Sequence, residues 1–563
     1  MTAYVPRLRL PALAFAGLLL ARGVLRAQDP VVLTVPGLGT LSFPVTTNVP
    51  AARVAFARGA LLLHLFEYPD AAHAFRAAEQ LDPSLAMAYW GEAMTHTHPV
   101  WNEQDVPAGR AALEKLAPTV GARAANAHTA RERAYLATVE LLYGTGPKAH
   151  RDTLYSSAMG RLVHAYPADD EARLFYALSL LGLSQGVRNV ATYLQAAAIA
   201  ESVFHRTPSH PGAAHYLIHA VDDPDHATLG LAPARALARS AYAVDHAQHM
   251  TSHIFVALGM WDEVVAANET AAHVVDTLLG RRQRSPMYCR HYNVWLDYGY
   301  LEAGRIGDAT RLLEHCRDQA RARAPGSHDQ ELDISSFVTM WSHYVLVTGA
   351  WSDSVARWPI DPGDRLGPRL TYWFTHGLAA ASEGDLAAAR AALEKVEEAA
   401  RETAGWLASS GDPAPDHPEL ERTRVLRAEL EGVIAAGDGR TEEALSRLRQ
   451  ATLAEDSIVY AFGPPFVNEP AHELLGAALV TLKRFPEAQR EFALALTRAP
   501  RRTTALLGLA RAAAALGDTT QATGAYEELT RIWQRADPGQ AQVAEAADYV
   551  RRHGAAVGVQ GPR

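Results

Sequence analysis

The chain has 563 residues, of which 48% are hydrophobic and 20% are charged, and it contains 40 glycines and 32 prolines. This composition is typical of a folded globular protein and excludes a disordered, collagen-like or linker chain. The net charge is −9; without residues 1–27, which carry four arginines and no acidic residue, 49 basic and 62 acidic residues give −13. A chain this acidic lacks the basic surface that general nucleic-acid binding needs, so we expect no nucleic-acid partner.

Residues 1–27 have the layout of a secretory signal peptide. Arg7 and Arg9 precede an apolar stretch from Leu10 to Ala21, and the small Ala27 stands before Gln28. An amphipathic first helix is the alternative. No later segment contains 18 consecutive apolar residues, so we expect an exported chain, periplasmic or extracellular, whose mature part has no membrane span.

The mature chain begins with a short extended segment and then becomes helical. Residues 28–50 predict an extended or β arm, because VVLTVPGLGTLSFPVTT partly alternates apolar and polar residues and is rich in β-branched types. From Ala51 onward, apolar residues recur at spacings of three and four, which is typical of amphipathic helices.

A 34-residue repeat decides the architecture. The segment HELLGAALVTLKRFPEAQREFALALTRAP has small, aromatic and proline residues where the tetratricopeptide (TPR) pattern requires them. These residues are Leu475, Gly476, Ala488, Phe492, Ala495 and Pro500. The same roles fall on Leu509, Ala522 and Tyr526 and, near the start, on Gly59, Ala71, Phe75, Ala78 and Pro83.

Each such helix pair has an apolar face that only neighbouring pairs can cover, so the pattern predicts an all-α, right-handed superhelical α-solenoid. We expect a TPR-like N-terminal block over 51–400, a linker over 401–421 that is rich in Gly, Pro and Asp, and C-terminal repeats over 422–563. A second interruption, residues 459–470, predicts an ordered loop, because Phe462 and Phe466 are costly to leave in water.

Histidines concentrate in the segments SHPGAAHYLIHAVDDPDHATLG and VDHAQHMTSHIF. His215 and His219 are four residues apart and share a helix face, and a shift of 34 residues places His249 and His253 in the same roles. The two pairs should therefore stack as a ladder on successive helices. His246 lies on the same stripe, which we expect to line the concave groove.

Neutral imidazole is the commonest ligand of transition metals in proteins, so the ladder predicts a site for Zn, Cu or Fe made by His215, His219, His246, His249 and His253. Asp222 is an additional ligand or an outer-shell partner. A polar groove for an organic or peptide ligand, and histidines that only satisfy structural hydrogen bonds, are the alternatives. Other expected groove residues are Glu92, His96, His291, Tyr298 and His343.

Glu92 and His96 reach this groove only if the superhelix brings the N-terminal units round; aromatic packing beside a polar loop is the alternative. The chain lacks the HExxH, GxSxG and GxxxxGK[ST] motifs, and no GxGxxG follows a strand, which lowers the expectation of an enzyme. The two cysteines, Cys289 and Cys316, fall on antiparallel helices of one unit. They form either a disulfide or two buried thiols.

The blocks HPGAAHYLIHAVDDPDHA, HMTSHIFVALGMWDEVVAAN, YCRHYNVWLDYGYLEAGR and FGPPFVNEPAHELLG resemble those of a group of exported bacterial TPR proteins, over nearly the whole mature chain. The resemblance implies an all-helical repeat fold and export, with His215, His219, His249 and His253 facing a common groove. It implies no particular reaction.

Two functions follow from the sequence. The first is an exported binding or scaffold protein that takes a protein or peptide ligand in a groove with a histidine cluster, where a transition metal is an optional component. The second is a metal-dependent hydrolase or oxidoreductase that uses the same histidines, assisted by a carboxylate such as Glu92 or Asp222. A platform with no ligand at the histidines is a third.

Overall fold

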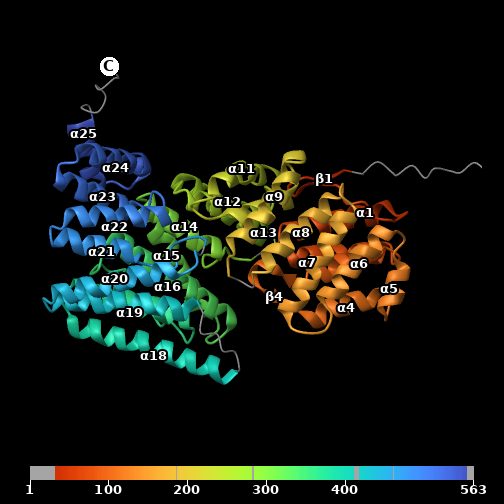
Figure 1. Cartoon of the computed structure of the whole chain (residues 1–563), viewed down its shortest axis with the longest axis horizontal. Helices are drawn as coiled ribbons and strands as arrows, with labels where there is room; N and C mark the ends of the chain where they lie inside the picture. Colours follow the sequence, from red (N-terminus) through yellow and green to blue (C-terminus); the bar gives the residue numbers. More distant parts are fainter. Residues whose placement is uncertain (1–31, 185–186, 282–283, 411–417, 461, 555–563) are drawn as a thin grey trace, which may run out of the picture.

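The computed structural model describes residues 32–184, 187–281, 284–410, 418–460 and 462–554, and the predicted signal peptide lies outside these ranges. The described chain begins with an antiparallel hairpin of β1 (Leu33–Val35) and β2 (Gly39–Leu41), which pairs Leu33 with Leu41. The remainder is a superhelical α-solenoid (Figure 1). The predicted fold class, including the short N-terminal strands, is therefore confirmed.

The first part of the solenoid contains α1 (Pro50–His64), α2 (Tyr68–Leu81), α3 (Ala86–Met94), α4 (Val106–Leu116), α5 (Val120–Asn126), α6 (Ala130–Leu142), α7 (Lys148–Ala165), α8 (Asp170–Gly182) and α9 (Val190–Arg206). Between α3 and α4 lie the two-residue strands β3 (Thr97–His98) and β4 (Glu103–Gln104), with a 3-10 turn over Pro99–Trp101.

The middle part contains α10 (Pro211–Val221), α11 (Leu231–Ser240), α12 (Asp245–Ala257), α13 (Trp261–Arg281), α14 (His291–Glu302), α15 (Ile306–Ala322) and α16 (His328–Thr348). The last part contains α17 (Leu366–Ser382), α18 (Leu386–Ser410), α19 (Pro418–Gly437), α20 (Thr441–Ser457), α21 (Ala471–Thr481), α22 (Phe485–Arg498), α23 (Thr503–Leu516), α24 (Thr519–Ile532) and α25 (Ala541–His553). Short 3-10 turns cover Ala227–Gly230 and Trp533–Arg535.

The small and aromatic repeat positions pack as the pattern predicts. A Cβ atom added to Gly59 would lie 2.8 Å from the ring of Phe75, and one added to Gly476 would lie 2.9 Å from the ring of Phe492. Both glycines let the first helix of a pair approach the aromatic ring of the second, so a larger residue would separate the helices.

The predicted linker requires a correction. Residues 401–410 belong to the helix α18, and residues 418–421 already belong to α19. Half of the segment RETAGWLASS consists of good helix formers and it contains no proline, whereas Gly411, Pro413 and Pro415 all follow it. Residues 411–417 lie outside the described ranges.

The C-terminal repeats pack back onto the middle of the chain. The green helix α14 lies beside the blue helices in Figure 1, and one buried apolar cluster extends from Leu38 to Ala546. Trp261 Nε1 donates to the carbonyl oxygen of Arg501 at 2.9 Å, and Asp537 N donates to the carbonyl oxygen of Gly304 at 2.9 Å. The two predicted blocks therefore share a core.

Gly259 makes one of these contacts. It follows α12 with a φ of +61°, and a Cβ atom there would lie 2.1 Å from the carbonyl oxygen of Pro500. Only glycine combines the left-handed conformation with this close approach.

A buried ion cluster centred on Arg502 also holds the C-terminal repeats against the middle of the chain. Arg502 is 1% exposed; its Nε donates to Glu473 Oε1 at 2.6 Å, and its Nη1 donates to Tyr298 Oη at 2.7 Å and to Glu302 Oε1 at 3.2 Å. Thr503 N donates to Glu302 Oε2 at 2.8 Å.

No helix in the described ranges is long and apolar enough to cross a membrane.

We expect Arg502→Ala to lower the free energy of unfolding by about 3–5 kcal/mol, because it leaves two buried carboxylates without their cation. Urea denaturation measures this change. Arg511→Ala, which breaks an exposed pair with Glu545, is the control and should cost at most about 1 kcal/mol. Equal effects of the two variants would show that the buried cluster does not hold the C-terminal repeats.

Candidate metal centre

Six histidines from three helices form one continuous cluster. His215 and His219 lie on α10, His246, His249 and His253 lie on α12, and His291 begins α14. The stacking of these helices brings the imidazoles into contact, with centroid separations of 5.1 Å between His215 and His246, 5.8 Å between His219 and His253, and 4.7 Å between His249 and His291. The predicted ladder is therefore present in the structure.

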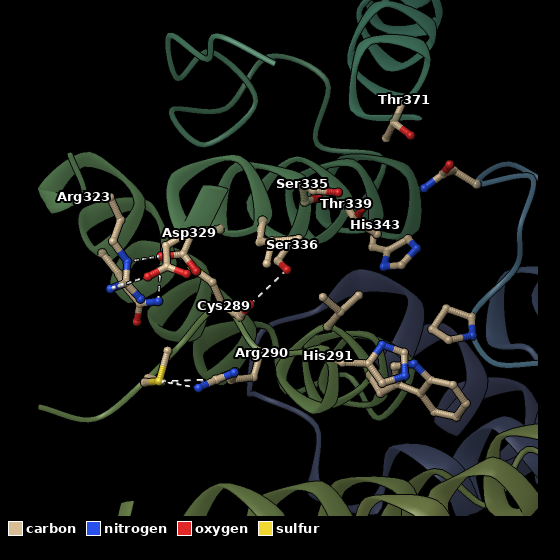
Figure 2. A pocket seen from close by; sticks show the side chains of 18 of the residues that line it. Cys289, Arg290, His291, Arg323, Asp329, Ser335, Ser336, Thr339, His343 and Thr371 are labelled. Carbon is tan, nitrogen blue, oxygen red and sulfur yellow. Dashed lines mark hydrogen bonds and ion pairs between the residues drawn. The ribbon is translucent and has the colours of Figure 1, made fainter. Parts of the chain in front are cut away.

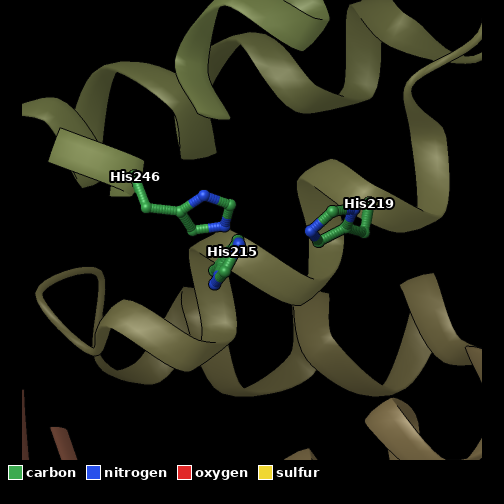
Figure 3. A group of neighbouring side chains, drawn as sticks. All are labelled: His215, His219 and His246. Carbon is green, nitrogen blue, oxygen red and sulfur yellow. The ribbon is translucent and has the colours of Figure 1, made fainter. Parts of the chain in front are cut away.

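The cluster divides into two groups of three. In trio 1 (His215, His219 and His246) and in trio 2 (His249, His253 and His291), one ligand atom from each residue lies within 4.8 Å of the other two. Figure 3 shows the imidazoles of trio 1 turned toward one another. Three nitrogens around one ion at 2.0–2.1 Å are about 3.4 Å apart, so a shift of about 1 Å converts each trio into a three-nitrogen site.

The arrangement differs from the predicted site, in which two stacked pairs share one ion. Each pair instead combines with a histidine near the start of the next helix but one, namely His246 of α12 for the pair on α10 and His291 of α14 for the pair on α12. The pattern ends in the flanking helices, where Gly212 occupies the position of His246, and Val294 and Tyr298 occupy those of His249 and His253. The repeat therefore builds the same site twice.

Hydrogen bonds from Nδ1 orient three of the imidazoles. His215 donates to the carbonyl oxygen of His64 at 2.7 Å, and His249 donates to Asn268 Oδ1 at 2.8 Å. The amide of Asn268 itself donates to the carbonyl of Val264, which fixes its oxygen toward His249. With the proton on Nδ1, Nε2 of each ring carries a free lone pair, which is the arrangement of a metal-ligating histidine.

Four Nε2 atoms of the cluster are buried and have no hydrogen-bond partner; they belong to His215, His219, His246 and His249. A buried polar atom without a partner costs about 1–3 kcal/mol. Four such atoms in two adjacent groups therefore indicate a ligand that the protein chain does not itself supply.

Burial keeps the imidazoles neutral. Desolvation lowers the pKa of His215 to about 3 and that of His291 to about 4, and it lowers the pKa values of the other four well below 6.5. Neighbouring histidines add to the shift at five of the six sites, because each would repel a second positive charge. At neutral pH the cluster therefore presents lone pairs and not protons.

Asp222, predicted as an additional ligand or an outer-shell partner, lies beside His253. His253 Nδ1 donates to its Oδ2 at 3.0 Å, and Arg188 Nη1 donates to its Oδ1 at 2.6 Å. Burial raises the pKa of Asp222 to about 7, while the Arg188 guanidinium favours its charged form. Arg188 also donates to Asp223 Oδ2 at 2.6 Å, so one guanidinium holds both carboxylates in place.

A second buried group, made of His64, Glu171 and His210, contacts His215 through the carbonyl oxygen of His64. Glu171 accepts from Nε2 of His64 at 2.8 Å and from Nε2 of His210 at 3.1 Å. Burial would raise the pKa of Glu171, but the two imidazoles outweigh it and lower the pKa to about 2. His64 uses both ring nitrogens, in bonds to Glu171 and Tyr216, whereas Nδ1 of His210 has no partner; the bonds of His64 help to fix its backbone, whose carbonyl orients His215.

Phe66 is a site residue that the sequence did not single out. It has a φ of +61°, which is rare for a bulky side chain, and its ring centroid lies 4.3 Å from that of His215 and 5.9 Å from that of His246. Strained residues of this kind persist where the surrounding structure demands them, often at functional sites. No pattern in the sequence marks this conformation.

Trio 2 opens into a cavity of about 940 Å³, which we call the chamber. His291 and Trp295 form part of its wall, and the ring of Trp295 stacks on His253 at a centroid distance of 4.4 Å. His343, another predicted groove residue, also lines the chamber, as Figure 2 shows. An external molecule in the chamber therefore reaches the edge of trio 2.

Three other predicted groove residues lie elsewhere. Glu92 accepts from Lys115 Nζ at 2.6 Å and from Arg76 at 3.2 Å, so its charge is already paired. His96 follows α3, on the same part of the chain, and neither residue belongs to the trios. Tyr298 accepts from Arg502. None of these three faces the histidine ladder: ion pairs engage Glu92, and Tyr298 lies at the closing contact of the solenoid, where its ring packs on His343 at a centroid distance of 5.2 Å.

Cys289 and Cys316 form a disulfide, with the sulfurs 2.11 Å and the Cα atoms 5.0 Å apart. Of the two alternatives that the sequence left open, the structure therefore has the bond. It ties the segment before α14 to α15, two residues from His291, and Cys289 lines the chamber. The disulfide thus limits the motion of the third ligand of trio 2.

No protein-family model matches the chain, and no curated protein matches it. Solved structures match it at low similarity. Yeast Tom70 is 13% identical over 91% of this chain and 97% of its own, with a TM-score of 0.28; a human IFIT1 structure with m7Gppp-AAAA is 13% identical over 87% and 91%, with a TM-score of 0.31. The APC/C Cut9–Hcn1 structure is 14% identical over 90% and 96%, with a TM-score of 0.29. These values carry no inference about function.

We expect the metal-free protein to lose stability as the pH falls from 7 to 5. Between about pH 6.5 and pH 4, histidines of the unfolded chain bind protons that the folded cluster excludes, so the free energy of unfolding decreases with decreasing pH. Thermal unfolding in the presence of a chelator measures the slope. The variant His215→Gln/His249→Gln has two fewer such groups and should show a shallower slope; an unchanged slope would contradict the neutral cluster.

Proposed function

We propose that the protein is a metalloprotein that holds two transition-metal ions side by side, one in each histidine trio. The observation that carries the proposal is the set of four buried, unpartnered Nε2 atoms directed into the trios. A histidine with a structural role can use both ring nitrogens, as His64 does with Tyr216 and Glu171.

The ligand chemistry favours copper among the three predicted metals. Imidazole nitrogen binds Zn, Cu and Fe, and the general affinity order of divalent ions places copper highest. Both trios consist of histidines alone, so the ligands carry no charge that would balance that of an ion, and only trio 2 has a carboxylate, Asp222, beside it. Monovalent copper carries the smallest such charge.

The geometry supports an oxidoreductase more than a scaffold. Three protein ligands leave a coordination position open, and trio 2 faces the chamber through His291. A bound redox-active ion at that position would supply electron transfer to a molecule in the chamber. We therefore propose a metal-dependent oxidoreductase, and a solenoid that only binds protein or peptide partners is the competing function.

We further propose that the protein is exported, as its resemblance to exported bacterial TPR proteins implies. Two features support this: the signal-like composition of residues 1–27 and the disulfide between Cys289 and Cys316, a bond typical of oxidising compartments.

Protein purified without a histidine tag should bind two equivalents of copper. His215→Gln/His219→Gln and His249→Gln/His253→Gln should each retain one equivalent, because each variant removes two ligands from a single trio. Elemental analysis after dialysis measures the stoichiometry. The exposed pair His73→Gln/His205→Gln is the matched control and should bind two. Less than 0.2 equivalents in the unmodified protein would end the proposal.

Asp222→Asn should lower the affinity of trio 2 for its ion by about 10- to 100-fold, because the loss of the negative charge reduces the basicity of His253. Competition with a chromophoric chelator gives both affinities. The control Asp223→Asn removes a carboxylate that contacts Arg188 and His226 but not His253. Equal weakening of both trios, or the same effect in the control, would contradict the assigned role.

A further inference from the structure

We infer that the chamber binds a small organic carboxylate with a planar apolar body and holds it beside trio 2. This inference rests on the proposed function, because it names the class of molecule that the metal centre would meet. It stands on three observations. A loop closes one side of the chamber, one wall carries two buried nitrogen atoms without hydrogen-bond partners, and the wall nearest trio 2 is aromatic.

The loop of residues 462–470 bounds the chamber. Phe462 packs on His253 at a centroid distance of 5.0 Å, and a Cβ atom on Gly463 would lie 2.5 Å from the ring of Trp295. Farther along the loop, Phe466 lies under the guanidinium of Arg422, whose Cζ is 5.4 Å from the ring centroid. The loop thus crosses the concave face of the solenoid. A volume of about 940 Å³ suits a small molecule.

Arg422 is the anion anchor. It is 4% exposed; its Nη2 donates to Thr371 Oγ1 at 2.6 Å and to Asn468 Oδ1 at 2.5 Å, and its Nη1 donates to Glu419 Oε2 at 3.0 Å. These contacts fix the guanidinium on the chamber wall, but its buried Nε has no partner. A carboxylate oxygen is the acceptor that an arginine Nε–H prefers.

His343 provides the second polar group. It is 2% exposed, lies on the chamber wall, and its buried Nδ1 has no partner. Burial, followed by the charges of Arg502 and Arg422, lowers the pKa of His343 to about 3. A neutral imidazole next to a fixed guanidinium can donate one hydrogen bond to the second oxygen of a bound carboxylate.

Arg422 is itself ion-paired with Glu419 at 3.0 Å, so what it offers a ligand is the unpartnered Nε–H, and the other charges around the chamber do not occupy that atom. Arg323 is paired with Asp333 at 2.8 Å, so neither offers a free charge. Burial raises the pKa of Glu429 well above its ordinary value, so this neighbour of Arg422 is neutral. Arg290, at the end near trio 2, donates to Met287 Sδ and adds a positive charge. The chamber therefore favours an anion although the whole chain is acidic.

The aromatic wall selects the body of the ligand. Trp295 and Phe462 line the chamber beside His253, and Pro464 and Pro465 continue this surface toward Arg422. A carboxylate held at Arg422 thus directs a planar apolar body along this wall toward His291. Stacking on these rings would stabilise the body without any further polar contact.

The test uses 3-phenylpropionate and its uncharged analogue 3-phenylpropanamide. Calorimetry on the copper-loaded protein should show 1:1 binding of the acid and at least 10-fold weaker binding of the amide. With the copper oxidised to its divalent, paramagnetic state, addition of the acid should also change its electron paramagnetic resonance spectrum. Equal affinity for acid and amide, or no binding of the acid, would overturn the inference.

Two variants locate the anchor. Arg422→Gln should weaken binding of the acid at least 10-fold, while Arg427→Gln, which removes the same charge from an exposed position on α19, should leave it unchanged. Unaltered binding by Arg422→Gln overturns the inference; if that variant does not fold, the comparison of acid and amide on the unmodified protein decides.

The failure of the proposed function gives a different result. If the protein takes up no copper, calorimetry on the metal-free chain still tests the carboxylate site. Acid-selective binding there supports the anchor and overturns only its connection to a metal. Normal copper uptake without acid-selective binding overturns the chamber assignment and leaves the metal centre intact.

Discussion

The buried lone pairs of the histidine cluster are the constraint on which the surrounding structure depends. Each unpartnered Nε2 costs about 1–3 kcal/mol, and four of them lie within two adjacent trios. Hydrogen bonds from Nδ1 hold two of these four rings, His215 and His249, and also the ring of His253 in the same cluster. Phe66, held at a positive φ, closes the apolar side of the same group. The interior thus keeps water away from atoms that water would readily satisfy, an arrangement suited to metal ligands.

A repeat fold explains why the site occurs twice. The first helices of successive repeat units present equivalent positions to one groove. A histidine pair four residues apart on one such helix, with a third histidine on the first helix of the next unit, therefore forms the same triangle again one repeat later. The second triangle is less regular, since His291 follows His249 by 42 residues, whereas His246 follows His215 by 31. The longer connection contains Cys289, and the disulfide to Cys316 restores the rigidity that a long connection loses. The disulfide thus helps to hold His291 in trio 2, as regular stacking holds His246 in trio 1.

Local periodicity was enough to predict the solenoid, the small and aromatic packing positions and the histidine ladder, because these features depend on neighbouring repeats. It was also enough to select Asp222, which follows α10 directly. The division into trios could not be predicted, since it depends on the rotation between successive helices. The predicted positions of Glu92 and Tyr298 beside the histidine ladder were wrong because their partners, Lys115 and Arg502, come from elsewhere in the chain. Nothing in the sequence gives those pairings. Phe66 was missed because its backbone conformation is a consequence of tertiary packing.

The closing contact of the solenoid connects the metal centre to the C-terminal repeats. Arg502 and Glu302 join α23 to α14, and the same part of the chain carries the loop that places Phe462 on His253. An open solenoid would expose trio 2 along its whole groove, where water would reach the ligands and raise the effective dielectric. The loop and His291 both line the chamber, so this side of trio 2 faces the chamber. The ion cluster around Arg502 is far from the histidines in sequence, yet it joins the C-terminal repeats to α14, the helix that begins with His291, so the surroundings of the histidine cluster include more than the three helices that carry it.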